Sequence, residues 1–324
     1  MTQIKYSGGV AHIGLGKTGS TYLQRHYFSK LNLSFFSTES PFEWPQALNF
    51  IREGNTLWYH DINNCSQIFA KDARQDFYRK KIQLRLNKWL KNTERFKAEI
   101  SNEQPWIISA EGLCGLSSDI CALHMPLLQN AGISKIIFIT RKQVDYAQSL
   151  WRQFLLKEDR FAKFVPFEIL FGNGEETGIV ELDWNQYIKS MDTCFGNNNV
   201  LVLPYELMTE SPLIFVDRIN RFLEIAPQEG SFDTAIRENM SRMDPAYYGL
   251  LTDHLFSSPQ LSWARKATHR IAKKIPNYTP KFIKKRYSMN PNPELLARLK
   301  HSFRESNKRL EERMEINLGD FGYY

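Results

Sequence analysis

Four short apolar runs along the chain have the character of buried strands. They are residues 9–13, 106–109, 135–140 and 200–203, with the sequences GVAHI, WIIS, KIIFIT and VLVL. The runs are continuous rather than alternating, which is typical of parallel strands that helices cover on both faces. Stretches of helical character separate them, at residues 20–29, 74–100, 144–157 and 212–223. This alternation predicts an α/β fold with a central, mostly parallel sheet flanked by helices.

The pattern changes in the last third of the chain. Prolines recur and strand signals stop between about residues 226 and 293, and a charged amphipathic helix is expected from Asn292 to Met314. This part has no set of strands of its own. We therefore expect a single domain over residues 1–324, with residues 226–293 as a basic helical or irregular cap within it.

Composition is typical of a folded protein with a sizeable core. Of the 324 residues, 42% are hydrophobic and 13% are aromatic. No apolar stretch approaches the roughly 18 residues of a membrane span, and the N-terminal MTQIKYSGG lacks the apolar core of a signal peptide, so a cytoplasmic location is expected. The four cysteines show neither paired nor metal-type spacing, which predicts reduced thiols and no metal site.

The net charge of +7 is concentrated in one segment. No acidic residue occurs between His254 and Pro293, whereas this stretch holds nine Lys and Arg residues, and the remaining 33 basic side chains nearly balance the 35 acidic ones. Residues 263–287 interleave these cations with apolar and aromatic side chains. Two functions suit this segment, contact with an anionic membrane surface and guidance of an acidic glycan, and a solvated face of the cap is equally compatible. No recognition motif for nucleic acid accompanies the charge.

A glycine-rich loop follows the first predicted strand. Residues 14–21 read GLGKTGST and lead into a helical stretch that begins YLQRHYF. Glycines let the backbone approach an anion closely, and the start of the following helix offers unpaired N–H groups. Lys17 adds a positive charge, and the hydroxyl groups of Ser20 and Thr21 add donors. The loop is therefore predicted to bind a phosphate or a similar anion.

A kinase or nucleotide triphosphatase that uses Mg-ATP is one interpretation of this loop. Its motif, G-x-x-x-x-G-K-[ST], fits residues 11–18 except that Ala11 stands at the first glycine position. Such enzymes also need an aspartate after another strand to hold Mg²⁺. The second and third apolar runs lead instead into Ala110-Glu111 and Arg141. A catalytically inactive nucleotide-binding module is a further alternative.

Two other strand ends carry candidate site residues. Arg141 follows the third strand and Ser149 lies eight positions later on the predicted helix, so that a guanidinium and a hydroxyl could meet one phosphate. Glu111 follows the second strand, where partial desolvation would raise the pKa of its carboxyl group and suit a general base. The carboxyl ends of parallel strands share one edge of the sheet, so these residues and the loop are expected there together.

In combination these motifs resemble the sulfotransferases that use 3′-phosphoadenosine 5′-phosphosulfate (PAPS). The resemblance rests on KTGSTY at residues 17–22, on Arg141 and Ser149, on YELMTESP at 205–212 and on the ending SNKRLEERMEINLGDFGYY. It implies a P-loop-like α/β fold and transfer of a sulfuryl group without a metal. The acceptor would be a hydroxyl or amine, with a carbohydrate or glycolipid expected, and the product adenosine 3′,5′-bisphosphate (PAP).

The resemblance also assigns roles to individual residues. Lys17 would stabilise the leaving phosphate, Arg141 and Ser149 would hold the 3′-phosphate, and Glu111 would be the general base, with Glu39 and Glu43 as rivals. Tyr22 and Tyr205 occupy places near the adenine, although both also suit a hydrophobic core. The late Arg-Lys-Gly phosphate loop of the family is missing. The remaining donor-binding candidates are Gly16, Thr18, Gly19, Ser20 and Thr21 in the loop, and Asn239, Ser241 and Arg242 in place of the missing motif.

Overall fold

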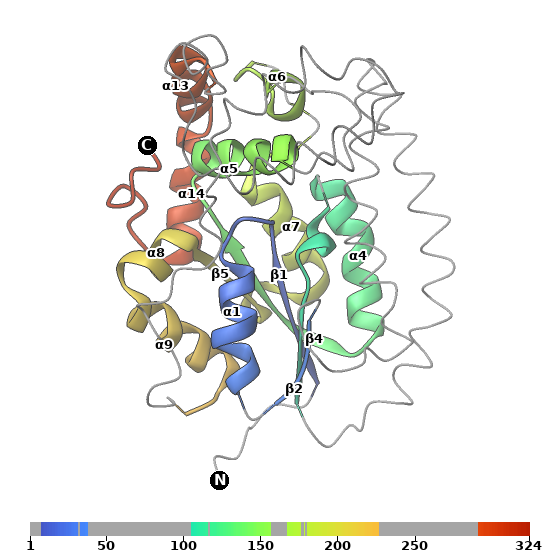
Figure 1. Ribbon diagram of the computed structural model, residues 1–324. Coiled ribbons are helices and arrows are strands. Elements are labelled where there is room, and N and C mark those ends of the chain that lie inside the picture. Colours follow the sequence, from blue (N-terminus) through green and yellow to red (C-terminus); the bar gives the residue numbers. More distant parts are fainter. Residues whose placement is uncertain are drawn as a thin grey trace, which may run out of the picture.

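The computed structural model describes residues 8–31, 33–37, 105–115, 117–156, 167–175, 178, 180–226 and 291–324. In these ranges the strands form one parallel sheet with the order β2-β3-β1-β4-β5 (Figure 1). The strands are β1 (Gly9–Gly14), β2 (Ser34–Ser37), β3 (Trp106–Ser109), β4 (Ile133–Thr140) and β5 (Val200–Pro204). The predicted α/β class is confirmed, and so are all four predicted strands. The edge strand β2 was not predicted.

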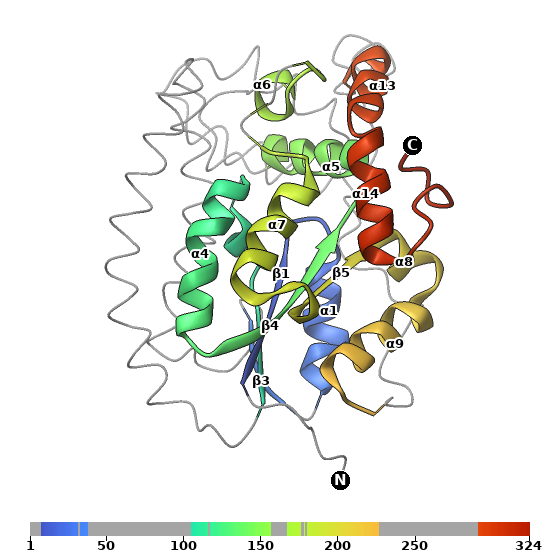
Figure 2. The same cartoon turned by 180° about the vertical axis from the view of Figure 1, so that it is seen from behind.

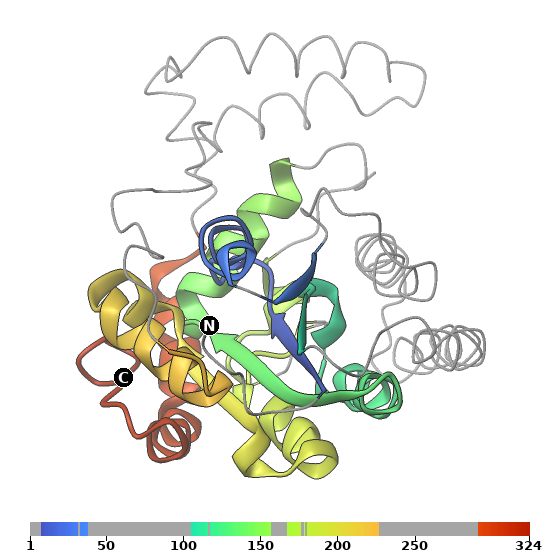
Figure 3. The same ribbon diagram turned by 90° about the horizontal axis from the view of Figure 1, so that it is seen from below.

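Helices cover both faces of the sheet (Figures 1 and 3). One face packs against α1 (Ser20–His26), α8 (Tyr205–Glu210) and α9 (Pro212–Leu223). Further helices cover the other face (Figure 2). Their apolar side chains join the core on that side. These helices are α4 (Ser118–Asn130), α5 (Gln143–Leu156), α6 (Phe167–Phe171), α7 (Trp184–Phe195), α13 (Pro293–Ser302) and α14 (Arg304–Met314). In the part of the chain that the structure describes, short 3₁₀ helices span Phe28–Lys30, Glu111–Cys114 and Asn197–Asn199.

Because helices cover both faces of the sheet, the strands are continuous runs of apolar residues rather than alternating ones. Every residue of β1 is buried. Val10 contributes to the core on the α1 face, whereas Ala11 and Ile13 contribute to the core on the opposite face. Successive side chains of a strand point to opposite sides, so a strand covered twice has no solvent-facing position to fill with polar residues.

The C-terminal helix differs in one respect from its prediction. Asn292 starts it as expected, since its side chain accepts a hydrogen bond from the Glu294 N–H, 2.9 Å away. A single helix from Asn292 to Met314 is wrong, because the chain breaks at Phe303 into α13 and α14. Phe303 has φ −96° and ψ 3°, and its partly buried side chain packs against the core. The change of direction lets α13 pack against α5 while α14 packs against α7 and β5.

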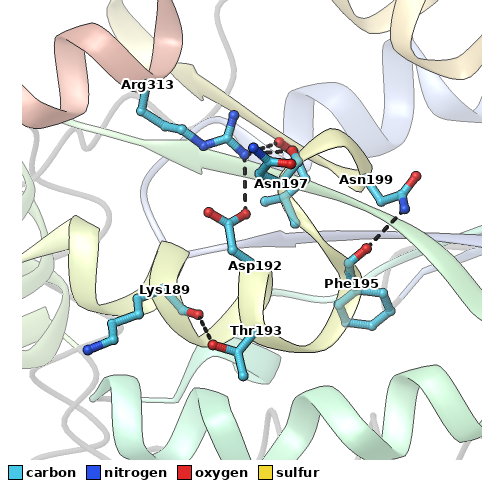
Figure 4. A network of polar contacts seen from close by, with 8 residues as sticks. Lys189, Asp192, Thr193, Phe195, Asn197, Asn199 and Arg313 are labelled. Atoms are coloured by element: carbon cyan, nitrogen blue, oxygen red, sulfur yellow. Dashed lines mark hydrogen bonds and ion pairs between the residues drawn. The ribbon is translucent and has the colours of Figure 1, made fainter.

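Arg313 anchors the end of α14 to the rest of the domain (Figure 4). Its Nη2 donates to the carbonyl oxygens of Asn197, 2.8 Å away, and Val200, 2.9 Å away. It also forms an ion pair of 3.2 Å with Asp192 of α7. The end of α14 is thus fixed beside Val200, the first residue of β5.

Several predictions fall outside the described residues. These are the helix at 74–100, Cys65, most of the proposed cap at 226–293 and the basic segment 263–287. Of the described cysteines, Cys114 and Cys121 are buried free thiols and Cys194 is a half-buried one. Within the described ranges, no helix combines the length and apolar character that crossing a membrane requires.

Candidate functional site

The loop between β1 and α1 has an unusual backbone conformation. Lys17 and Gly19 have φ of 74° and 79°, in the left-handed region that residues other than glycine rarely adopt. Left-handed residues at alternating positions are typical of concave loops whose N–H groups converge on an anion. The Thr18 hydroxyl closes the loop from within, since it donates to the Leu15 carbonyl over 2.6 Å. The predicted anion loop therefore has a conformation suited to that task.

Gly14 is required where the strand meets the loop. A Cβ atom at Gly14 would lie 2.8 Å from the Thr18 hydroxyl oxygen, which is closer than such atoms come. The hydrogen bond between Thr18 and Leu15 thus depends on a glycine at this position. This requirement explains one glycine of the motif through packing inside the loop.

Arg141 lies directly against this loop. Its Nη1 donates to the Lys17 carbonyl oxygen over 2.8 Å, and its guanidinium carbon lies 4.8 Å from the centroid of the Tyr205 ring. A Cβ atom added at Gly19 would be 3.0 Å from the same ring, so Tyr205 also borders the loop. The structure thus brings together Lys17, Gly19, Arg141 and Tyr205, all of which the sequence nominated.

The guanidinium of Arg141 retains an unused donor. Its Nε is buried and has no hydrogen-bond partner among the described residues. An N–H group buried in this way is costly unless something accepts its hydrogen bond. A ligand oxygen at the loop would meet that need.

The backbone around Arg141 is held by buried side chains that were not predicted as site residues. The Trp184 indole donates to the Arg141 carbonyl over 2.8 Å. The Glu206 carboxylate accepts from the Lys142 N–H at 3.0 Å and from the Tyr323 hydroxyl at 2.9 Å. Burial raises the pKa of Glu206, and these two donors oppose the rise. Its position directly after Tyr205, at the end of a predicted strand, was the available sequence signal.

A second buried polar cluster joins β1 to β3. The His12 Nδ1 lies 2.7 Å from the Ser109 hydroxyl, which also accepts from the Gln24 side chain at 3.0 Å. The His12 Nε2 is buried without a partner among the described residues, and burial lowers the pKa of His12 to about 3. The Ala110 N–H donates to the His12 carbonyl at 3.0 Å, so these contacts fix the end of β3 immediately before Glu111.

His12 makes stability depend on pH. The ordinary pKa of the imidazole is 6.5, so below this pH the unfolded chain takes up a proton that the folded chain, with a His12 pKa of about 3, refuses. Stability is therefore lost as the pH falls, by about 1.4 kcal/mol per unit in this window. We expect the His12 contribution to cost about 2 kcal/mol between pH 7 and pH 5.

Urea unfolding at both pH values measures this effect. The control is His12→Asn, whose amide can still hydrogen-bond to Ser109 but does not titrate. The difference between wild type and variant isolates His12 from carboxyl groups that titrate in the same range. An equal loss of stability in the two proteins would show that His12 is not the group responsible.

The other predicted site residues lie on several elements or outside the described residues. Ser20 is the first residue of α1 and is buried, Thr21 is half-buried beside it, and Ser149 is half-buried on α5. Tyr22 is buried in the hydrophobic cluster on the α1 face, and its contact with adenine stays a prediction. Glu111, two positions after the last residue of β3, begins a 3₁₀ helix. The residues outside the described ranges are Glu39, Glu43, Asn239, Ser241 and Arg242.

Comparison with protein families favours the sulfotransferase interpretation of the site. Residues 117–253 match the family model of the sulfotransferase domain. These residues have the sequence of a sulfotransferase domain. The match includes Arg141, Ser149 and Tyr205, whereas the loop at residues 14–19 precedes it. The general activity that this match supports is the transfer of a sulfuryl group to an acceptor.

Three of the solved structures that this chain resembles are those of sulfotransferases. One from Alicyclobacillus acidocaldarius is 15% identical with a TM-score of 0.47, over 96% of this chain and 97% of that chain. A mouse sulfotransferase complexed with PAP is 16% identical with a TM-score of 0.40, over 68% and 60% of the two chains. A sulfotransferase domain from the curacin biosynthetic pathway is 12% identical with a TM-score of 0.41, over 96% and 99%.

At these identities and TM-scores the likenesses identify no residue and no substrate of this chain. No curated protein sequence matches the chain. The assignment of individual residues therefore rests on the geometry of the site.

Proposed function

We propose that this sulfotransferase takes PAPS as its donor and releases PAP. The observation that carries the proposal is the contact between Arg141 and the loop, where the guanidinium donates to the Lys17 carbonyl at 2.8 Å. It brings the Arg141 guanidinium from the end of β4 to the backbone of the loop that follows β1, and this loop carries a second cationic residue, Lys17. PAPS carries negative groups at both its 5′ and 3′ positions, which calls for two such cations.

The loop and Arg141 would divide the recognition of the donor. The backbone N–H groups of residues 18–21 would hold the 5′-phosphate, and Lys17 would neutralise the charge that develops as the sulfuryl group departs. Arg141 would hold the 3′-phosphate with Ser149, and its buried Nε is one donor available for that purpose. Tyr205, whose ring packs against Arg141, would border the adenine.

Glu111 would act on the acceptor. In the proposed step its carboxylate takes the proton of the attacking hydroxyl, the new oxygen–sulfur bond forms, and the bond between sulfur and the phosphate oxygen breaks. Its backbone position after β3 lies at the same sheet edge as the loop, next to the contacts of His12 and Ser109. Glu39 and Glu43 are the alternative bases.

The proposed acceptor is a carbohydrate or a glycolipid. The basic segment 263–287 would guide an acidic glycan or lie against an anionic membrane, in a cytoplasmic single-domain enzyme. A screen with ³⁵S-labelled PAPS over glycans, glycolipids and small phenols tests the acceptor class. Transfer to phenols alone would refute a carbohydrate or glycolipid acceptor.

Calorimetric binding of PAP, AMP and Mg-ATP tests the donor. AMP lacks only the 3′-phosphate of PAP, so we expect PAP to bind about 10²-fold more tightly, as two charge-assisted contacts would provide. The competing kinase interpretation requires residues 11–18 to form the phosphate loop, but residues 11–14 belong to β1. Tight binding of Mg-ATP together with no binding of PAP would overturn the proposal.

Ser149→Ala refines this test. We expect the affinity for PAP to fall about tenfold and the affinity for AMP to stay the same, since a hydrogen bond to a charged group is worth about 1.5 kcal/mol. Calorimetry of the two nucleotides with the variant measures both values. Equal losses for PAP and AMP would place Ser149 away from the 3′-phosphate.

A further inference from the structure

We infer that the C-terminal segment, residues 315–324, is a positioning element of the donor site, acting on Arg141 through Glu206. The inference deepens the proposed function, since it concerns how Arg141 is held for a donor. None of the residues that carry it contacts the proposed reacting atoms. They act through the turn that follows β4.

Tyr323 reaches this turn through one carboxylate. It is 2% exposed, and its hydroxyl donates to Glu206 Oε2 at 2.9 Å. The other oxygen, Glu206 Oε1, accepts from the Lys142 N–H at 3.0 Å. Two hydrogen bonds therefore connect the C-terminal tail to the peptide group that joins Arg141 to Lys142.

Asn307 of α14 makes a second connection between the tail and the turn. Its side chain accepts from Gln143 Nε2 at 2.7 Å and donates to Gln143 Oε1 at 3.2 Å. The same amide donates to the Tyr323 carbonyl at 3.3 Å. With Trp184 bound to the Arg141 carbonyl, three consecutive residues, 141–143, are held by side chains from three other parts of the fold.

Arg141 connects these hydrogen bonds to the loop that follows β1. Its guanidinium is fixed between the Lys17 carbonyl and the Tyr205 ring, and Tyr205 is the residue immediately before Glu206. Glu206 is therefore adjacent in sequence to Tyr205, which packs on the Arg141 guanidinium, and it accepts a hydrogen bond from the residue that follows Arg141. Buried hydrogen-bond networks lose much of their order when one member is left without its partner. Glu206 lies two positions after the last residue of β5. Arg313 holds α14 at the opposite end of this strand, beside its first residue (Figure 4).

The test compares two tyrosine variants of equal chemistry. Tyr323→Phe removes the hydroxyl that reaches Glu206, and Tyr27→Phe removes a buried hydroxyl that donates to Asn220 at 2.7 Å, near the other end of α1. Both side chains are at most 2% exposed, so similar losses of thermal stability are expected. We expect Tyr323→Phe alone to weaken PAP binding, by about three- to thirtyfold, as for other residues that act through a coupled network.

A double-mutant cycle shows whether the effect passes through Arg141. In an Arg141→Ala background, Tyr323→Phe is expected to cause no further loss of PAP affinity, because the group it positions is gone. Additive losses would mean that the tail acts by another route and would overturn the inference. Glu206→Gln, which keeps an oxygen for the Lys142 N–H, should lose less affinity than Glu206→Ala.

Hydrogen exchange of the ligand-free protein gives a readout that does not depend on PAP. Amides of residues 14–19 should exchange faster in Tyr323→Phe than in Tyr27→Phe. If wild type fails to bind PAP while this difference is present, the proposed donor is wrong and the positioning role stands. If the two variants match in both exchange and affinity, the tail has only a structural role and the inference fails.

Discussion

Replacement of Lys17 by alanine is expected to lower the turnover of sulfuryl transfer by about 10²-fold or more at saturating donor. The physical reason is the loss of a preorganised positive charge at the bond that breaks. The contact with Arg141 uses the Lys17 carbonyl and survives the change. Alanine at φ 74° carries nearly the same backbone cost as lysine, so the loop keeps its conformation. Initial rates of ³⁵S transfer, measured as kcat, give the result.

Two further substitutions at this position separate charge from backbone. Lys17→Gly relieves the left-handed backbone cost and still lacks the ammonium group, so its turnover should be as low as that of the alanine variant. Lys17→Arg restores a charge and should recover part of the rate. Turnover of Lys17→Ala within about threefold of wild type would exclude the proposed transition-state role, which calls for a far larger loss.

The core of the fold could be predicted because parallel strands with helices on both faces are continuous apolar runs in the sequence. The runs at 106–109 and 212–223 coincide with β3 and α9. The edge strand Ser34–Ser37 reads SFFS, too short and too polar at its ends to stand out. Helix α7 was not predicted either, although its buried tryptophan, tyrosine and methionine recur at helical spacing.

The site could be predicted only as far as local sequence defines it. Lys17 and Arg141 follow strand ends, and the topology of a parallel sheet brings such residues to one edge. The contact of Arg141 with the Lys17 carbonyl depends on the register of β1 and β4, which no local pattern reveals. Glu206 and Tyr323 lie 117 positions apart, and each alone is an ordinary polar residue of a helix or tail.

Replacement of Gly19 by alanine is expected to weaken PAP binding by about 10²-fold. Gly19 has φ 79° and ψ 13°, a left-handed conformation that costs another residue about 1 to 2 kcal/mol. The new methyl group would also overlap Met208 Cε and would lie 3.0 Å from the Tyr205 ring. Relief of these contacts moves either the loop or the ring that supports Arg141. Calorimetry with PAP and a thermal melt measure the outcome.

Two controls divide this loss into backbone and steric parts. Gly196→Ala adds a methyl group at a glycine with φ 78° that has no atom within 4 Å, so it should cost stability and leave PAP affinity unchanged. Adding Met208→Ala to the Gly19→Ala variant frees the space around Met208 Cε but leaves the backbone and the Tyr205 contact unfavourable. About tenfold of the lost affinity should then return, equal to about 1.4 kcal/mol of relieved overlap. Wild-type affinity in Gly19→Ala itself would mean that PAP does not need the loop in this conformation.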